Sequence, residues 1–270
     1  MRTLLHVSDL HFGRVDQALL APLLERARVV KPDVVVVSGD LTQRARRAEF
    51  REARAFLDAL PSPQIIVPGN HDVPLYNVFD RFTKALEKYR AIITNDLQPF
   101  YADDEIAILG INTARSLTIK DGRINERQIE GIRQKMCPLG ANIIKIVVTH
   151  HPFDLPESSP HPVVGRADLA MEAIARCGVD VILSGHLHLI HTGHSAERFR
   201  LAGRSSLIIQ AGTATSTRGR GEMNSFNVIR IDGKTISVER DLWQPEAGVF
   251  APAAVERFEE TERGWSLAAG

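Results

Sequence analysis

The chain has 270 residues, 44% of them hydrophobic and 24% charged, which is enough apolar material for a sizeable globular core. Lysine plus arginine equals aspartate plus glutamate, at 33 each, so the net charge gives no general attraction to nucleic acid or to an anionic membrane. We expect one main domain, and the charge balance disfavours nucleic acid as a partner.

The start of the chain lacks the features of a secretory signal. Met1 and Arg2 lead directly into a strand-like run, with no basic head, longer apolar stretch or small-residue cleavage site. No apolar run approaches the roughly 18 residues that a membrane span needs. These observations predict a cytoplasmic protein without a membrane partner.

Cys137 and Cys177 are the only cysteines, and they are far apart in the sequence. Their spacing matches neither a zinc finger nor the disulfide framework of a small secreted domain. We expect both to be inert, packed side chains.

Short β-rich apolar runs alternate with longer segments of helical periodicity, which is the pattern of an α/β layered domain. The expected strands are Thr3–Val7, Val34–Ser38, Gln64–Val67, Ile106–Ile111, Ile143–Thr149 and Val181–Ser184. Apolar residues at three- and four-residue spacings predict helices over Gln17–Val30, Arg47–Leu60, Val78–Lys88, Glu126–Lys135 and Ala167–Cys177.

Beyond Leu189 the pattern changes to alternating runs that are separated by glycine-bearing turns. The runs Phe199–Leu201, Ser206–Gln210, Phe226–Ile231 and Thr235–Arg240 predict a β-meander that completes a second sheet. From about Trp243 onward prolines and alanines dominate. We therefore expect a main domain over residues 1–242 and a partly ordered tail over 243–270, packed on the body or on a neighbouring subunit.

Aspartate, asparagine and histidine residues gather directly after the expected strands. They are Asp9 and His11, then Asp40, then Asn70 with His71 and Asp72, then His150, and finally His186 and His188. In α/β sheets, the loops that leave the carboxyl ends of strands form the ligand crevice. We expect these five loops to converge on one edge of the molecule.

Seven of these side chains, all except His71 and Asp72, form a set of oxygen and imidazole donors without thiolates. Such a set suits divalent ions such as Mn, Fe, Co or Zn rather than a structural cysteine site. Two ions are needed to use all seven donors, and a carboxylate is the natural bridging ligand. The i, i+2 spacing of Asp9 with His11, and of His186 with His188, places each pair on one side of an extended segment.

Other histidines have a plainer interpretation. A histidine near a strand end is usually a packed or surface residue, and this applies to His6, His161, His191 and His194. His151, beside His150, is either a support for the ligands or a packing residue.

The five motifs resemble the calcineurin-like metallophosphoesterase superfamily, whose pattern is D-x-H, G-D, G-N-H-[DE], H and G-H-x-H. The matching segments are Asp9-Leu10-His11, Gly39-Asp40, Gly69-Asn70-His71-Asp72, His150 and Gly185-His186-Leu187-His188. The resemblance spans residues 3 to about 231. It implies an α/β fold, a four-layer αββα sandwich with two facing mixed β-sheets.

The resemblance also assigns roles to the residues. It gives Asp9, His11 and His188 to one metal and Asn70, His150 and His186 to the other, with Asp40 as the bridge. His71 is the substrate-facing histidine that stabilises or protonates the leaving oxygen, and Asp72 holds its imidazole in orientation. His150 rather than His151 is the ligand, because the family's H-x-P spacing matches Pro152.

The segments 212–218 and 224–227 look like the bacterial class III cyclic-nucleotide phosphodiesterase branch and its glycerophosphodiesterase relatives. The resemblance implies a two-metal hydrolase of small phosphodiesters, in which a metal-bridging hydroxide attacks phosphorus. A phosphomonoesterase or protein phosphatase is the main alternative. A non-catalytic scaffold of the same fold is disfavoured because all seven ligands are present, and a nuclease is disfavoured by the neutral charge.

The apolar residues of the tail leave the oligomeric state open. Trp243, Val249, Phe250 and Phe258 suit a homodimer interface. A monomer whose tail packs on its own sheet accounts for the same residues.

Overall fold

The structure, a computed structural model, describes residues 1–75, 78–116, 121–154, 163–187, 191–194, 205–217 and 222–268. The strands are β1 (Arg2–Val7), β2 (Val34–Val37), β3 (Gln64–Ile66), β4 (Phe100–Ala102), β5 (Ile106–Gly110), β6 (Ile144–Val148), β7 (Val181–Ser184), β8 (His191–His194), β9 (Leu207–Gln210), β10 (Ser225–Asp232), β11 (Thr235–Gln244), β12 (Val249–Thr261) and β13 (Gly264–Leu267). The helices are α1 (Gln17–Val30), α2 (Arg47–Ala59), α3 (Val78–Thr83), α4 (Glu87–Ile92), α5 (Glu126–Met136) and α6 (Ala167–Arg176), with a 3₁₀ turn, η1 (Asn70–Asp72).

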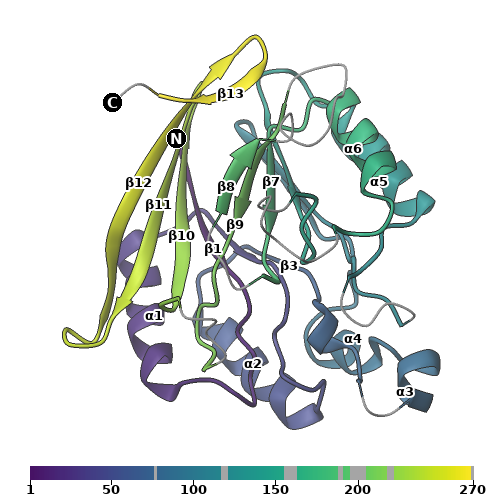
Figure 1. Cartoon of the computed structure of the whole chain (residues 1–270), viewed down its shortest axis with the longest axis vertical. Helices are drawn as coiled ribbons and strands as arrows, with labels where there is room; N and C mark the ends of the chain where they lie inside the picture. The colour runs from purple at the N-terminus through teal and green to yellow at the C-terminus, as the bar shows by residue number, and fades with distance from the viewer. Residues whose placement is uncertain are drawn as a thin grey trace.

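The strands form two mixed sheets. The first has the order β13-β12-β11-β10-β1-β2-β3, with β1, β2 and β3 parallel and β10 to β13 antiparallel. The second has the order β4-β5-β6-β7-β9-β8, with a parallel centre and antiparallel outer strands. Figure 1 shows α5 and α6 on one side of the molecule and the β10–β13 strands on the other.

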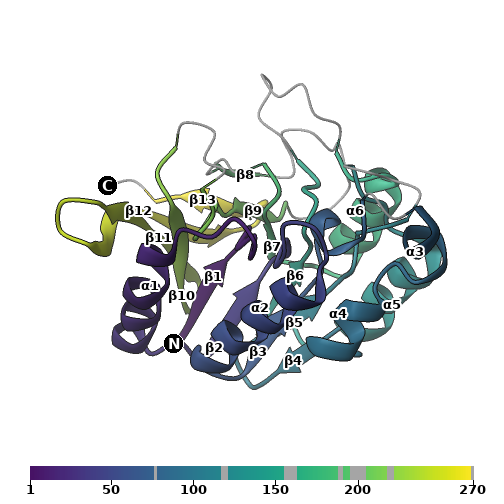
Figure 2. The ribbon, with the colours of Figure 1, turned by 90° about the horizontal axis from the view of Figure 1, so that it is seen from below.

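Within the described part of the chain, three hydrophobic cores separate four layers. The run of four valines in β2 shows why: Val34 and Val36 lie in the core between the two sheets, whereas Val35 and Val37 lie in the core beneath the first sheet's helices. Successive strand residues point to opposite faces, so a strand buried on both sides is apolar throughout. A third core joins the second sheet to α5 and α6. The expected four-layer αββα sandwich is confirmed, and Figure 2 shows α1 and α2 beside the first sheet.

The expected elements agree with the structure along most of the chain. Each of the six predicted strands before Leu189 is present, within one residue at either end. The single helix expected over Val78–Lys88 is instead two helices, α3 and α4, separated by the turn at residues 84–86. The strand expected over Phe199–Leu201 lies outside the described residues. Among the described residues, no helix is both long and apolar enough to cross a membrane.

The expectation of a partly ordered tail is wrong for residues 249–267, which form β12 and β13. β12 pairs with β11 from Val249 to Glu259, with an irregularity in the pairing near Pro252. Most residues of β12 are exposed on both faces, so the strand lacks the apolar alternation by which strands are predicted. Backbone pairing with a neighbour, rather than burial, therefore forms this strand (Figure 1).

The apolar residues suggested for a homodimer pack mostly within the chain. Phe250 is buried in the core beneath α1, with Trp243 packed against it, and Phe258 is buried between the sheets. Val249 is 45% exposed. Packing of the C-terminal strands on their own sheet thus accounts for most of this set.

Cys137 and Cys177 form a disulfide, so the expectation of two separate, inert thiols is wrong. Cys137 directly follows α5 and Cys177 directly follows α6, and these helices pack beside each other on the second sheet. The contact comes from helix packing, and a sequence separation of 40 residues gives no local signal of it.

His6 is a buried histidine that makes stability depend on pH. Its ring is fully buried in β1, Nε2 lies 2.9 Å from Ser38 Oγ, and burial lowers its pKa to about 3. The unfolded chain takes up a proton near pH 6.5 and the folded chain does not, so stability falls as pH drops from 6.5 toward 3. We expect His6 to remove about 2 kcal/mol of unfolding free energy between pH 7 and pH 5.

Urea unfolding of the wild type and of His6→Gln at both pH values measures this contribution as the difference between their pH dependences. The variant is expected to lose less stability on acidification. Equal losses in the two proteins would show that His6 is protonated in the folded state.

Candidate metal centre

The predicted metal ligands follow strands of both sheets, and the fold brings six of the seven together. These six are Asp9 and His11 after β1, Asp40 after β2, Asn70 after β3, His150 after β6 and His186 after β7. The seventh, His188, lies outside the described residues. The carboxyl ends of the parallel strands in the two facing sheets therefore meet at one edge, as expected.

Asp40 lies between two groups of donors. Its Oδ1 is 3.4 Å from His150 Nε2, and its Oδ2 is 3.7 Å from His11 Nε2. His11 Nε2 is also 3.6 Å from Asp9 Oδ1. One carboxylate therefore faces a donor group with each of its oxygens, which is the arrangement of a bridging ligand.

The second donor group surrounds His150. Its Nε2 lies 3.1 Å from Asn70 Oδ1 and 3.3 Å from His186 Nδ1. His150 Nδ1 donates to Ser38 O at 2.8 Å, so Nε2 is the nitrogen that faces the other donors and would bind a metal ion once it is deprotonated. These clustered oxygen and imidazole donors, without thiolates, fit divalent ions such as Mn, Fe, Co or Zn.

Four of these residues have a left-handed backbone. The φ angle is 55° at Asp9, 51° at His11, 52° at Asp40 and 76° at His186. Such angles are uncommon for residues other than glycine, and they concentrate at functional sites where the surroundings hold them. Here the Asp9 and His11 amides donate to backbone carbonyls of the β2 loop, at 3.1 and 2.9 Å.

The charged groups of the centre fix each other's protonation in the metal-free protein. Burial opposes ionisation of Asp40, but the imidazoles of His150 and His71 hold its pKa well below the ordinary value. Burial also opposes the charge on His150, yet the Asp40 carboxylate raises the pKa of His150 to about 9. Asp40 is therefore ionised, and a cation that binds here displaces a proton from His150.

The structure contradicts the predicted contact between Asp72 and the His71 ring. The Asp72 carboxylate accepts from the backbone amides of Leu41, Thr42 and Gly69 at 2.9–3.1 Å, and from Thr42 Oγ1. It therefore ties the β2 loop to the β3 loop. The His71 ring instead uses Nδ1 to donate to the Gln43 carbonyl at 2.8 Å, a partner that no local motif predicted.

Sequence reasoning also missed two threonines that hold the Asp9–His11 loop. Thr213 Oγ1 donates to Asp9 O, and Thr215 Oγ1 donates to Leu10 O, both at 2.9 Å. Both lie in the segment 212–218, whose resemblance to one branch of a family gives no indication of this contact. The sequence does show threonines two positions apart, Thr213 and Thr215, after a predicted strand, and such side chains often bond to backbone carbonyls.

The ring of His151 packs against two of the predicted ligand rings. Its ring centroid is 4.8 Å from those of His150 and His186, and its Nδ1 is 2.7 Å from Thr113 Oγ1. A Cβ atom at Gly122 would overlap the ring, so only glycine leaves room there. His150, His151 and His186 also form one cluster whose ligand atoms lie within 4.8 Å of one another, so the choice of His150 as the ligand stays a prediction from the H-x-P spacing.

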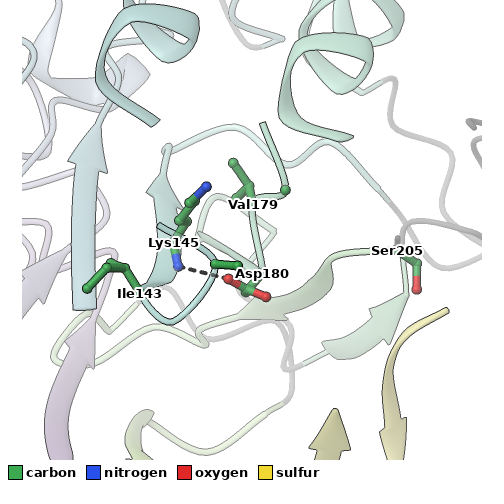
Figure 3. Close-up of a pocket in the computed structure, with 7 residues that line it drawn as sticks. Ile143, Lys145, Val179, Asp180 and Ser205 are labelled. Atoms are coloured by element: carbon green, nitrogen blue, oxygen red, sulfur yellow. Dashed lines mark hydrogen bonds between the residues drawn. The ribbon is translucent and has the colours of Figure 1, made fainter. Parts of the chain in front are cut away.

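A small pocket elsewhere in the second sheet is separate from this centre. Figure 3 shows it beside Lys145 and Asp180, and its volume is about 170 Å³. The Lys145 amide donates to Asp180 Oδ2 and its ammonium donates to Cys177 O, each at 2.9 Å. These residues lie at the amino ends of β6 and β7, whereas the metal ligands follow the carboxyl ends.

Known proteins resemble this chain in sequence and in fold. The family model for calcineurin-like phosphoesterases matches residues 2–189. The uncharacterized protein YpbG of Bacillus subtilis is 28% identical over 190 residues, which cover 69% of this chain and 61% of YpbG. The glycerophosphodiester phosphodiesterase GpdQ of Enterobacter lignolyticus is 28% identical over 174 residues, which cover 59% of this chain and 60% of GpdQ.

A probable cyclic nucleotide phosphodiesterase of Synechococcus is 25% identical over 194 residues, which cover 67% of this chain and 71% of the Synechococcus protein. The chain thus spans about three fifths of the length of YpbG and GpdQ. Among solved structures, the purple acid phosphatase PPD1 of yellow lupin superposes with a TM-score of 0.68 at 13% identity, over 94% of this chain and 53% of the phosphatase. At that identity the superposition shows a shared fold.

Proposed function

The chain belongs to the calcineurin-like phosphoesterase family, whose members hydrolyse phosphoester bonds with divalent metals, and on that basis we propose that it is a phosphodiesterase of small substrates. The proposed substrate class is a cyclic nucleotide or a glycerophosphodiester. The observation that carries the proposal is the Asp40 carboxylate between two groups of oxygen and imidazole donors.

The metal ligands of the proposal are the six described residues together with His188. Asp9, His11 and His188 would hold one ion, Asn70, His150 and His186 the other, and Asp40 both. Two divalent ions at such a site supply charge that neutralises phosphoryl oxygens and lowers the pKa of a bound water.

Two side chains of the β3 loop act on the substrate in this proposal. The Asn70 amide has NH₂ donors beside its ligand oxygen and stabilises negative charge that develops on the phosphoryl group. His71 has its Nδ1 engaged by the Gln43 carbonyl, so Nε2 is the nitrogen that transfers a proton to the leaving oxygen.

The preference for diesters rests on the relatives. One is named a glycerophosphodiester phosphodiesterase and two are named probable cyclic nucleotide phosphodiesterases, at 25–28% identity over part of the chain. These names support a small diester substrate for this chain. They do not specify which two alcohols the phosphate of that diester joins.

The test compares three substrates on metal-depleted protein reloaded with Mn or with Fe and Zn. We expect metal-dependent turnover of bis-p-nitrophenyl phosphate and cyclic AMP that exceeds turnover of p-nitrophenyl phosphate. Asn70→Ala removes both a metal ligand and a preorganised donor, and it is expected to lower diester turnover by at least about 100-fold.

The control is Asn142→Ala, which changes the same side chain in a loop at the amino end of β6 and is expected to leave turnover unchanged. Turnover of the monoester alone would replace this proposal with a phosphatase. No turnover with any metal would favour a binding protein of the same fold.

A further inference from the structure

The orientation of the His71 ring depends on a backbone carbonyl. His71 Nδ1 lies 2.8 Å from Gln43 O, and a carbonyl oxygen only accepts, so Nδ1 carries the hydrogen. The Gln43 side-chain amide nitrogen is 3.5 Å from the same Nδ1, and two donors do not bond each other. The carbonyl therefore places the imidazole hydrogen on Nδ1.

Gln43 belongs to a loop without regular structure, so its carbonyl needs other contacts to hold it. The Gln43 amide donates to Phe12 O at 2.8 Å. Directly after Gln43, the amides of Arg44 and Arg46 donate to one oxygen, Glu49 Oε2, at 2.8 and 3.3 Å. The Glu49 side chain is 9% exposed, so water competes little for these bonds.

Glu49 also touches the loop that carries Asp9 and His11. A Cβ atom at Gly13 would lie 2.8 Å from Glu49 Oε1 and 3.0 Å from its Cγ, so the carboxyl packs directly on the Gly13 backbone. Gly13 has a φ of 98°, which favours glycine, and the next amide, that of Arg14, donates to His11 O. One buried carboxylate thus contacts both the β1 loop and the β2 loop.

A cap of α2 explains only part of this arrangement. Glu49 occupies the third position of the helix, where a glutamate commonly accepts from the amide of the capping residue, here Arg46. The shorter bond is the one to Arg44, which lies outside the helix and next to Gln43. The stronger contact is therefore made to the loop.

We propose that Glu49 is a positioning residue for His71, acting through the Gln43 carbonyl, and that this role replaces the one expected of Asp72. Glu49 holds residues 44–46, these fix the Gln43 carbonyl, and the carbonyl presents His71 Nε2 to the leaving oxygen. The kinetic consequence of this proposal rests on the proposed function. Its structural consequence, the orientation of the His71 ring, rests on hydrogen bonds alone.

The structural test uses the metal-free protein. In wild type, the His71 Nδ1 proton, identified by its loss in His71→Gln, is expected to give a resolved, slowly exchanging imidazole resonance in ¹⁵N–¹H NMR. Glu49→Ala is expected to broaden or remove it. Glu49→Gln retains an acceptor oxygen and is expected to restore it. Glu52→Ala, an exposed glutamate of the same helix, is the matched control.

The kinetic test compares leaving groups on the metal-loaded protein. Glycerophosphoethanolamine releases an alkoxide, which needs a proton, whereas bis-p-nitrophenyl phosphate releases a stable phenolate, which does not. Glu49→Ala is expected to lower kcat for the alkyl diester by about ten- to hundredfold, part of what a general acid contributes, and to change the aryl diester by less than about threefold.

Equal losses for both diesters, together with an unchanged His71 resonance, would overturn the proposal and leave Glu49 as a helix cap. Failure of Glu49→Gln to restore the alkyl reaction would overturn it as well, because the role requires an acceptor rather than a charge. If the wild type hydrolyses neither diester, the proposed function fails, and the resonance still decides whether Glu49 holds the ring.

Discussion

Replacing Asp40 by asparagine is expected to lower diester hydrolysis by about three orders of magnitude, which corresponds to roughly 4 kcal/mol of transition-state stabilisation. The carboxylate is fully buried between His11 and His150, and each of its oxygens faces one donor group. An amide has nearly the same shape but lacks the charge that two cations need. The substitution therefore removes the bridging ligand while leaving the packing in place.

Metal content gives the direct measurement. The wild type is expected to retain two equivalents of Mn after gel filtration, and Asp40→Asn one or fewer. The control is Asp58→Asn, in which the carboxylate is 67% exposed on α2 and pairs with Arg54. Two retained ions and unchanged turnover in Asp40→Asn would show that Asp40 is not a bridging ligand.

Gly69→Ala is expected to destabilise the protein by about 2 kcal/mol and to lower diester turnover at least tenfold, because it overpacks the centre. Gly69 has a φ of −104°, which any residue adopts, so its need for glycine is purely one of space. An added Cβ would overlap both Oδ1 and the backbone nitrogen of Asp40. A backbone atom cannot move aside as a flexible side chain does, so the bridging carboxylate itself must shift.

Thermal unfolding and turnover of the variant are compared with those of Gly131→Ala. Gly131 lies inside α5, where an added Cβ would meet only the end of the Gln98 side chain, at 3.0 Å. Alanine favours a helix by about 1 kcal/mol over glycine, so this control is expected to be neutral or slightly stabilising. If Gly69→Ala is as stable and as active as this control, the β2 and β3 loops leave room for a methyl group between them.

The layers and the ligand loops of this protein were predictable from its sequence. The valine run of β2 is apolar at every position because both faces of the strand are covered, and runs of that kind separated by helical segments predict a layered α/β fold. The ligands directly follow such runs, so strand prediction also placed Asp9, Asp40 and His150 at one edge. Both inferences depend only on local periodicity, which the sequence contains.

Tertiary structure decided the features that depend on contacts between distant segments. β12 has no apolar alternation and exists because β11 supplies hydrogen-bond partners, and the Cys137–Cys177 bond exists because α5 and α6 pack together. The partner of His71 is a backbone carbonyl 28 residues away, and carbonyls have no sequence signature. The sequence alone determined which side chains can bind metal, because residue type fixes ligand chemistry. The folded loops determined which acceptor orients each imidazole, because that depends on distances that only packing sets.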